Sequence, residues 1–116
     1  MAKAVRYHKQ GGPEVLQLDE VPVGEPGPGQ ARVRHVAIGV NFVDTYQRSG
    51  LYPMQLPAAA GNEGAGLVEA VGPGVSNVRQ GDRVTYTGLP GSYCDVRLVP
   101  ADRLVKLPEE IGRAHV

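Results

Sequence analysis

The chain has 116 residues and a formal net charge of zero, with 12 lysines and arginines against 12 aspartates and glutamates. This length allows one domain with a hydrophobic core, and the neutral balance argues against a general binder of nucleic acid or of membrane surfaces. The 16 glycines and 10 prolines lie between apolar runs, so we interpret them as turns of a β-rich domain rather than as a sign of disorder.

The apolar segments are short and alternate with turn signals, a pattern typical of small barrels and sandwiches. The strands expected, in chain order, are 3–8, 15–21, 31–40, 64–72, 83–88 and 93–100. The segment GEPGPGQ, residues 24–30, holds too much glycine and proline for a helix or a central strand and is expected to be a loop. Residues 51–61 are expected to be extended and interrupted by prolines. The segment DRLVKLP, residues 102–108, is the last of the expected short segments.

The segment NFVDTYQRSG, residues 41–50, predicts one short helix after the third strand. Asn41 is suited to the N-cap position and Gly50 to the C-terminal end. Asp44 and Arg48 stand four residues apart, which favours a solvated ion pair on the helix surface. The polar side chains that follow the apolar strand either cap the helix or line a site, and the pattern leaves both interpretations open.

The cluster GNEGAG, residues 61–66, has the spacing G-x-x-G-x-G and precedes a strand. A dinucleotide-binding turn requires G-x-G-x-x-G before a helix, so we interpret these glycines as sites of close backbone approach. Glu63 stands among small apolar residues, where an unpaired charge is costly. It either pairs with a nearby arginine or with backbone donors, or it borders a cleft.

Cys94 is the only cysteine, which excludes an internal disulfide and a four-thiolate zinc site. In the expected last strand it shares a face with Val96 and Leu98, which favours a buried structural thiol. His8 and His35 have no partner at catalytic spacing and are interpreted as structural or surface residues. No apolar run of about 18 residues and no signal-peptide pattern is present, so we expect a cytoplasmic protein.

Several segments resemble the N-terminal part of the medium-chain dehydrogenase/reductases, in particular the zinc-independent NAD(P)H:quinone oxidoreductases, which are similar to zeta-crystallin. They are GGPEVLQL (11–18), the stretch 25–53, GNEGAGLVEAVGPGV (61–75) and GDRV (81–84), and the most specific part is VNFVDTYQRSGLYP. The resemblance implies a mainly β (α+β), GroES-like fold: a partly open β-barrel with one or two short helices. The Rossmann domain of such enzymes is absent from the chain, and the edge that would meet it is expected to expose apolar surface.

The zinc enzymes of this superfamily carry a cysteine ligand where this chain has Asn41. They carry a Gly-His-Glu motif where this chain has Gly61-Asn62-Glu63. Catalytic zinc needs about three protein ligands, so we expect no metal site.

The resemblance implies NADPH or NADH as the cofactor, with Asn41, Asp44 and Thr45 against its nicotinamide end. It places Tyr46 and Tyr52 on the substrate side as catalytic residues, where a phenol hydroxyl donates to a quinone oxygen and stabilises the developing negative charge. The alternative is that Asn41 only caps the helix and that the tyrosines are half-buried packing residues.

The function implied is that of the N-terminal fragment of a quinone oxidoreductase, acting on a quinone or another small conjugated carbonyl. The full-length parent is expected to be a homodimer without nucleic-acid or membrane partners. One alternative is a stand-alone GroES-like binding or chaperone-type module, and another is an enone or alkene reductase of the same superfamily. Because the domain that holds the cofactor is absent, the chain alone is expected to be inactive.

The last six residues, IGRAHV, match one reading frame of a widely used sequencing adapter. We therefore expect a GroES-like N-terminal catalytic domain over residues 1–110 and a non-native tail over 111–116. In that case Arg113 and His115 carry no functional weight.

Overall fold

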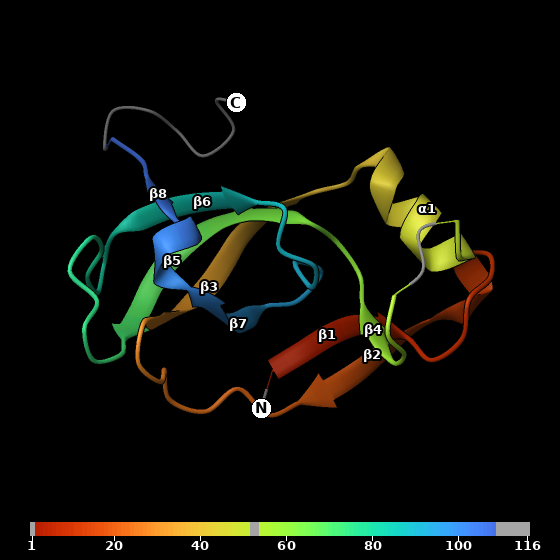
Figure 1. Cartoon of the computed structure of the whole chain (residues 1–116), viewed down its shortest axis with the longest axis horizontal. Coiled ribbons are helices and arrows are strands. Elements are labelled where there is room, and N and C mark those ends of the chain that lie inside the picture. The colour runs from red at the N-terminus through yellow and green to blue at the C-terminus, as the bar shows by residue number, and fades with distance from the viewer. Residues whose placement is uncertain (1, 52–53, 109–116) are drawn as a thin grey trace.

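The computed structural model describes residues 2–51 and 54–108 (Figure 1). Tyr52 and the expected tail 111–116 lie outside these ranges. The described residues are mostly strands, as predicted, and the elements in chain order are β1 (Ala2–Tyr7), η1 (Pro13–Val15), β2 (Leu16–Val21), β3 (Gln30–Gly39), α1 (Phe42–Ser49), β4 (Ala58–Ala59), β5 (Glu63–Val71), β6 (Arg83–Thr87), β7 (Val96–Pro100), η2 (Ala101–Arg103) and β8 (Val105–Lys106).

The strands form two antiparallel sheets that are not closed into a single barrel. The smaller sheet has the order β2-β1-β4 and the larger one the order β7-β3-β5-β6-β8. The two sheets meet at β1, where Ala4 forms an isolated bridge with Cys94 and the Val5 N–H donates to Tyr93 O at 2.7 Å. This arrangement confirms the expected partly open GroES-like fold.

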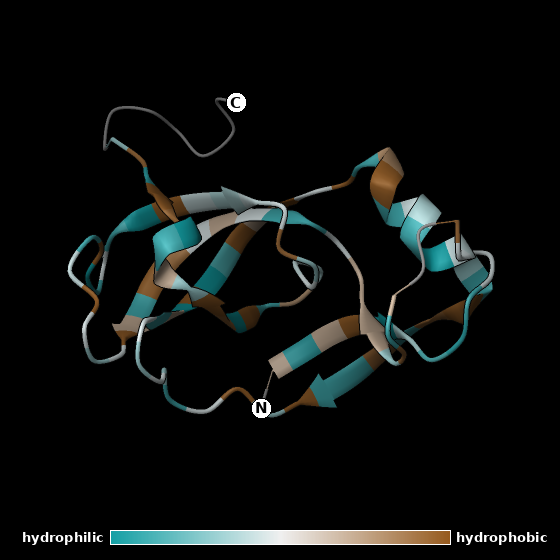
Figure 2. Ribbon diagram, in the orientation of Figure 1, coloured by the Kyte–Doolittle hydropathy of each residue, from teal (hydrophilic) through white to brown (hydrophobic). Residues whose placement is uncertain are grey.

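The hydrophobic core lies within the larger sheet and follows from the alternation of its strands. Apolar and polar residues alternate along the first half of β3 and along β6, as the bands in Figure 2 show. The valines on the inner face have at most 1% exposure: Val33, Val68, Val84 and Val99. Complete burial of such a side chain contributes roughly 1.5–3 kcal/mol, so this face is a main source of stability.

The helix α1 follows β3 as predicted. Asn41 occupies the N-cap position with an extended backbone, and Gly50 ends the helix in the left-handed region at φ 93° with its N–H bonded to Gln47 O. The C-terminal turn is held by the loop before β2, because Gly11 N–H donates to Arg48 O at 3.0 Å and Arg48 Nε donates to Gly11 O at 3.2 Å. The helix is therefore fixed beside the smaller sheet (Figure 1).

The predicted strand at 93–100 begins only at Val96. Asp95 interrupts it, because its Oδ1 accepts hydrogen bonds from the backbone N–H groups of Lys3 and Val96. Cys94 thus precedes β7, but it lines one cavity together with Val96 and Leu98, in agreement with the expected shared face. The half-buried thiol donates to Gly91 O at 3.3 Å, and burial raises its pKa to about 11.

None of the helices in the described part of the chain is long and apolar enough to cross a membrane.

Candidate functional site

The candidate site lies where β3 ends, α1 begins and β5 starts. Gly39, the last residue of β3, pairs with Glu63, the first residue of β5. A Cβ atom at position 39 would overlap the Glu63 carboxylate. A glycine at this position therefore lets the acidic side chain lie against the end of β3.

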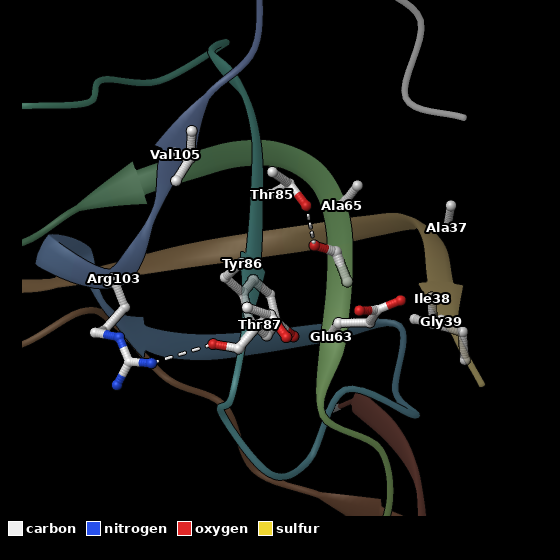
Figure 3. A pocket seen from close by; sticks show the side chains of 11 residues that line it. Ala37, Ile38, Gly39, Glu63, Ala65, Thr85, Tyr86, Thr87, Arg103 and Val105 are labelled. Carbon is white, nitrogen blue, oxygen red and sulfur yellow. Dashed lines mark hydrogen bonds between the residues drawn. The ribbon is translucent and has the colours of Figure 1, made fainter. Parts of the chain in front are cut away.

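A cavity of about 460 Å³ opens beside this pair, and Figure 3 shows the residues that line it. Its walls are largely apolar, and its polar groups come from Glu63, three successive residues of β6 and Arg103. The complete lining is Ala37, Ile38, Gly39, Glu63, Gly64, Ala65, Thr85, Tyr86, Thr87, Arg103 and Val105.

Two of the polar groups around the cavity are already bonded to backbone: the Thr85 hydroxyl donates to Gly64 O at 3.1 Å, and Arg103 Nη2 donates to Thr87 O at 3.2 Å (Figure 3). The half-buried Glu63 carboxylate forms no hydrogen bond or ion pair with any of the described residues. Glu63 lines the cavity, so of the two interpretations from the sequence we keep as a proposal the one in which it borders a cleft.

The lining residue Tyr86 belongs to a hydrogen-bonded group with His35 and Arg97. His35 Nδ1 donates to Cys94 O at 2.8 Å, so in the neutral ring Nε2 accepts from the Tyr86 hydroxyl at 2.7 Å. Arg97 Nη1 donates to the same hydroxyl at 3.2 Å. Burial lowers the pKa of His35 and raises that of Tyr86. His35 is therefore a structural histidine, as predicted, whereas His8 lies at the surface with Nε2 2.8 Å from Asp19 Oδ2.

A buried carboxylate holds the first turn of α1. Asp44 is only 8% exposed. Its Oδ1 accepts from Asn62 Nδ2 at 2.6 Å. Its Oδ2 accepts from the Tyr93 hydroxyl at 2.6 Å and from the Asn41 backbone N–H at 3.0 Å. Desolvation first, and then the hydrogen bond to Asp44 and its charge, raise the pKa of Tyr93 well above its usual range.

The expected solvated ion pair between Asp44 and Arg48 is wrong. Asp44 faces the donors of Asn62 and Tyr93 in the interior, and the guanidinium of Arg48 instead bonds to the backbone of Gly11. Helical spacing placed both residues on one side of the helix, but it did not show that this side packs on the rest of the domain.

Among the residues expected at the site, the structure bonds Asn41 to Asp44, and it places Glu63 at the cavity, next in the chain to the Asn62 that bonds to Asp44. Thr45 lies one residue beyond Asp44, and its hydroxyl donates to Phe42 O at 2.7 Å. Tyr46 is 39% exposed. The position of Tyr52 lies outside the described residues.

Sequence reasoning missed the residues that complete the buried group around Asp44. Asn62 was considered only as a replaced metal ligand, although its amide donates to both Asp44 Oδ1 and Gln47 Oε1, the latter at 2.9 Å. Tyr93 lies 49 residues from Asp44 in the chain, so no local spacing points to it. The available signal was the buried acidic position in the first helical turn, which requires donors from elsewhere.

In the parts of the chain that the structure describes, no three side chains among histidine, cysteine, aspartate and glutamate converge as a metal site. At the two positions compared with zinc ligands, Asn62 uses both amide hydrogens on Asp44 and Gln47. The backbone N–H of Asn41 is bonded to Asp44. The polar groups here therefore hold the start of the helix.

The two open antiparallel sheets, with one capped helix beside a cleft, define a GroES-like β domain. Residues 27–109 match the family described as the alcohol dehydrogenase GroES-like domain, and the chain belongs to this family.

Relatives and solved structures agree with this assignment. The chain is 50% identical to a quinone oxidoreductase of Pseudomonas aeruginosa over 96% of its length. It is 48% identical to a 2-haloacrylate reductase of a Burkholderia species over 96% of its length. The crystal structure of the Escherichia coli quinone oxidoreductase complexed with NADPH superposes with a TM-score of 0.91 at 45% identity, and covers 95% of this chain. The resemblance to the quinone oxidoreductases of the medium-chain dehydrogenase/reductase superfamily is thereby confirmed.

The chain spans about a third of the length of these relatives. It covers 35% of the Pseudomonas aeruginosa and Burkholderia proteins and 34% of the Escherichia coli chain. It corresponds to their N-terminal, GroES-like part.

Proposed function

We propose that this chain is the nicotinamide- and substrate-facing domain of an NADPH-dependent quinone oxidoreductase that uses no zinc. The observation that carries the proposal is the 50% identity to a quinone oxidoreductase over 96% of the chain. The Escherichia coli relative of similar fold is a complex with NADPH, which supports this cofactor for the full-length parent. The proposal includes a homodimeric parent in the cytoplasm and a native domain that ends near residue 110.

The residues present fit the nicotinamide end of such a cofactor. The exposed side chains of Val40 and Phe42, at 79% and 82%, flank Asn41 and form an apolar edge against which a planar ring can lie. The Thr45 hydroxyl and the amide of Asn41 lie in the same turn. The cluster at 61–66 opens a strand and not a helix, so it does not form the phosphate-binding turn of a dinucleotide site.

In the proposed reaction the cofactor, when bound, supplies the hydride. Asn41 and Thr45 form the cofactor side of the site, with the buried Asp44 behind them. Tyr46 and Tyr52 form the substrate side. A tyrosine hydroxyl that donates to the quinone oxygen stabilises the negative charge that develops there. The apolar walls of the cleft exclude water from the reacting groups.

The test uses the full-length enzyme, with Tyr46→Phe and Tyr52→Phe assayed for quinone-dependent NADPH oxidation. Loss of a hydrogen-bond donor to the developing charge is expected to lower kcat by about a hundredfold. Tyr7→Phe is the matched control, because this tyrosine is 1% exposed in the core of the smaller sheet. Full activity in both site variants would remove the tyrosines from the mechanism.

A second candidate function is the reduction of an activated alkene, because a 2-haloacrylate reductase is 48% identical over 96% of the chain. The same residues serve both substrates, because hydride transfer to either one places negative charge on an oxygen conjugated with the carbon that is reduced. Comparison of kcat/KM for 1,4-benzoquinone and for 2-chloroacrylate with the full-length enzyme decides between them.

The chain of 116 residues alone is expected not to oxidise NADPH, because its described residues contain no glycine-rich turn leading into an α-helix that would bind the pyrophosphate. Measurable turnover by the purified chain would contradict this. The alternative of a ring-forming binding module predicts that the chain elutes earlier than a monomer in size-exclusion chromatography, at a far larger apparent mass.

A further inference from the structure

The buried group around Asp44 has a role that needs no direct contact with the cofactor. We infer that Asp44 is a positioning residue, which together with Asn62 and Tyr93 sets the place of the α1 N-terminus beside the cleft. Only the effect of α1 on the reaction rests on the proposed function. The structural part stands on the hydrogen bonds of this chain.

The first step is the hydrogen bonding of Asp44 itself. Its two oxygens accept three hydrogen bonds, from the Asn41 N–H, Asn62 Nδ2 and the Tyr93 hydroxyl. A carboxylate at 8% exposure with three donors directed at it is satisfied within the protein. It therefore has little capacity left to bind a ligand.

The second step is that the three donors come from three separate parts of the chain. Asn41 belongs to the helix N-terminus, Asn62 precedes β5, and Tyr93 lies in the segment between β6 and β7. Asn62 bonds in addition to Gln47, one turn further along α1. Asp44 therefore joins the start of α1 to the strand that carries Glu63 and to the loop before β7.

The third step explains how Tyr93 comes within reach. Gly61 has φ 93°, and a Cβ atom there would overlap the Tyr93 ring and the Ser92 hydroxyl. The two segments lie side by side, with Gly91 N–H bonded to Gly61 O at 2.9 Å and Tyr93 N–H bonded to Ala60 O at 3.0 Å. The first glycine of the cluster GNEGAG thus makes room for the tyrosine ring.

The consequence concerns Asn41 and the residues after it. Asn41 follows the end of β3, where Gly39 borders the cavity, by two residues. Without the bonds to the Asp44 carboxylate, this turn keeps the backbone of β3, the Asp44 N–H bond to Asn41 O and the Asn62 bond to Gln47. The buried carboxylate therefore fixes Asn41, Thr45 and Tyr46 relative to Glu63 without touching the reactants.

The test is the amide hydrogen exchange of α1 in the full 116-residue chain, measured by NMR for Tyr93→Phe. This change removes one hydroxyl and one hydrogen bond to a charged acceptor. Exchange of the amides at Asn41 and in the first turn of α1 is expected to become about tenfold faster. Exchange in β3 and β5 at Val33 and Val68 is expected to be unchanged.

Tyr7→Phe is the matched control, because the Tyr7 hydroxyl is buried and has no hydrogen-bond partner among the described residues. Its loss leaves the exchange of α1 unchanged. A second variant, Asp44→Asn, replaces an acceptor with an amide that directs donors at Asn62 or Tyr93, so it is expected to speed exchange further. Unchanged exchange of α1 in both Tyr93→Phe and Asp44→Asn overturns the positioning role.

Kinetics of the full-length enzyme distinguish this inference from the proposed function. A positioning role predicts that Tyr93→Phe lowers kcat about three- to tenfold with little change in the KM for NADPH, since no cofactor contact is lost. A selective rise in that KM for Asp44→Asn, with α1 exchange unchanged, assigns Asp44 to direct cofactor contact and overturns the inference. If α1 exchange responds and the full-length enzyme reduces neither substrate, the proposed function fails while the positioning of α1 stands.

Discussion

Two carboxylates of the site have opposite surroundings. Asp44 accepts three hydrogen bonds in the interior, whereas Glu63 is half-buried at the cavity and has no partner in the described part of the chain. Loss of a buried acceptor with donors directed at it destabilises the fold, because the donors are then left unpaired. A partly desolvated charge without donors opposes folding.

Glu63→Gln is therefore expected to leave the free energy of unfolding unchanged or to raise it by up to about 1 kcal/mol. Asp44→Asn is expected to lower it by about 2 kcal/mol or more, since a buried charge-assisted network is broken. Denaturant unfolding of both variants at neutral pH measures the difference. Equal losses in the two variants would contradict the different roles.

The imidazole of His35 predicts a pH dependence of stability. Burial lowers its folded-state pKa below the value of about 6.5 for an unfolded chain. Between those two values the unfolded state binds more protons, so stability is fully present above about pH 6.5 and is lost as the pH falls, with a slope of at most about 1.4 kcal/mol per pH unit.

Comparison of the wild-type chain with His35→Gln from about pH 5 to 7 measures this slope, and the slope is expected to be smaller in the variant. The same comparison for His8→Gln, a side chain that is 44% exposed, is the control. A slope that is the same with and without the His35 imidazole would contradict the assignment.

At the scale of elements, β3 and β5 form the longest pairing of the molecule. They approach closely where Gly66 faces Arg34 and His35, and a Cβ atom at position 66 would overlap the backbone carbonyl of Arg34. The ladder has a register shift between His35 and Ala37 beside this point, which indicates a β-bulge. Neither strand can move away without disturbing the core on the other face.

Gly66→Ala is therefore expected to lower the free energy of unfolding by about 2–3 kcal/mol. Gly24→Ala is a matched control, because its Cβ would lie in open space at φ 71° and only the backbone strain of about 1 kcal/mol applies. Thermal unfolding of the two variants gives the comparison. A smaller effect at position 66 than at position 24 would contradict the close packing of β3 and β5.

The sequence was informative where local chemistry determines structure. Asn41 and Gly50 mark the ends of α1, and the strand at 31–40 is recognisable from its apolar pattern, because caps and strand periodicity act over a few residues. The interior location of Asp44 and its contact with Tyr93 arise from packing between segments 49 residues apart. Spacing along one helix carries no information about such a partner, which is why an ion pair was expected instead.

At the scale of the whole molecule, the expected exposed apolar surface is found along the end of β3 and the start of α1. Val36, Ile38, Val40 and Phe42 recur at every second position with exposures of 50%, 42%, 79% and 82%. Contiguous exposed apolar side chains indicate an interaction surface or a tendency to associate. In the full-length parent this edge is proposed to face the cofactor domain.

The chain alone is therefore expected to self-associate through this edge. Combined Val40→Thr and Phe42→Ser substitutions are expected to raise the dissociation constant roughly tenfold, which is about 1.4 kcal/mol. Leu18→Ser on β2, at 68% exposure, is the control on the other sheet. Sedimentation velocity at several concentrations measures the change, and equal effects of the two substitutions would show that association does not depend on this edge.

The hydrogen bond between Asp44 and Tyr93 also determines when the site is completed during synthesis. Its partners are 49 residues apart, and the bond from Lys3 to Asp95 that accompanies the junction of the two sheets spans 92 residues. Contacts of such sequence separation form late, because a long loop must close first. Because α1 is synthesised well before Tyr93, the hydrogen bond that fixes the helix forms only after residue 93 has left the ribosome.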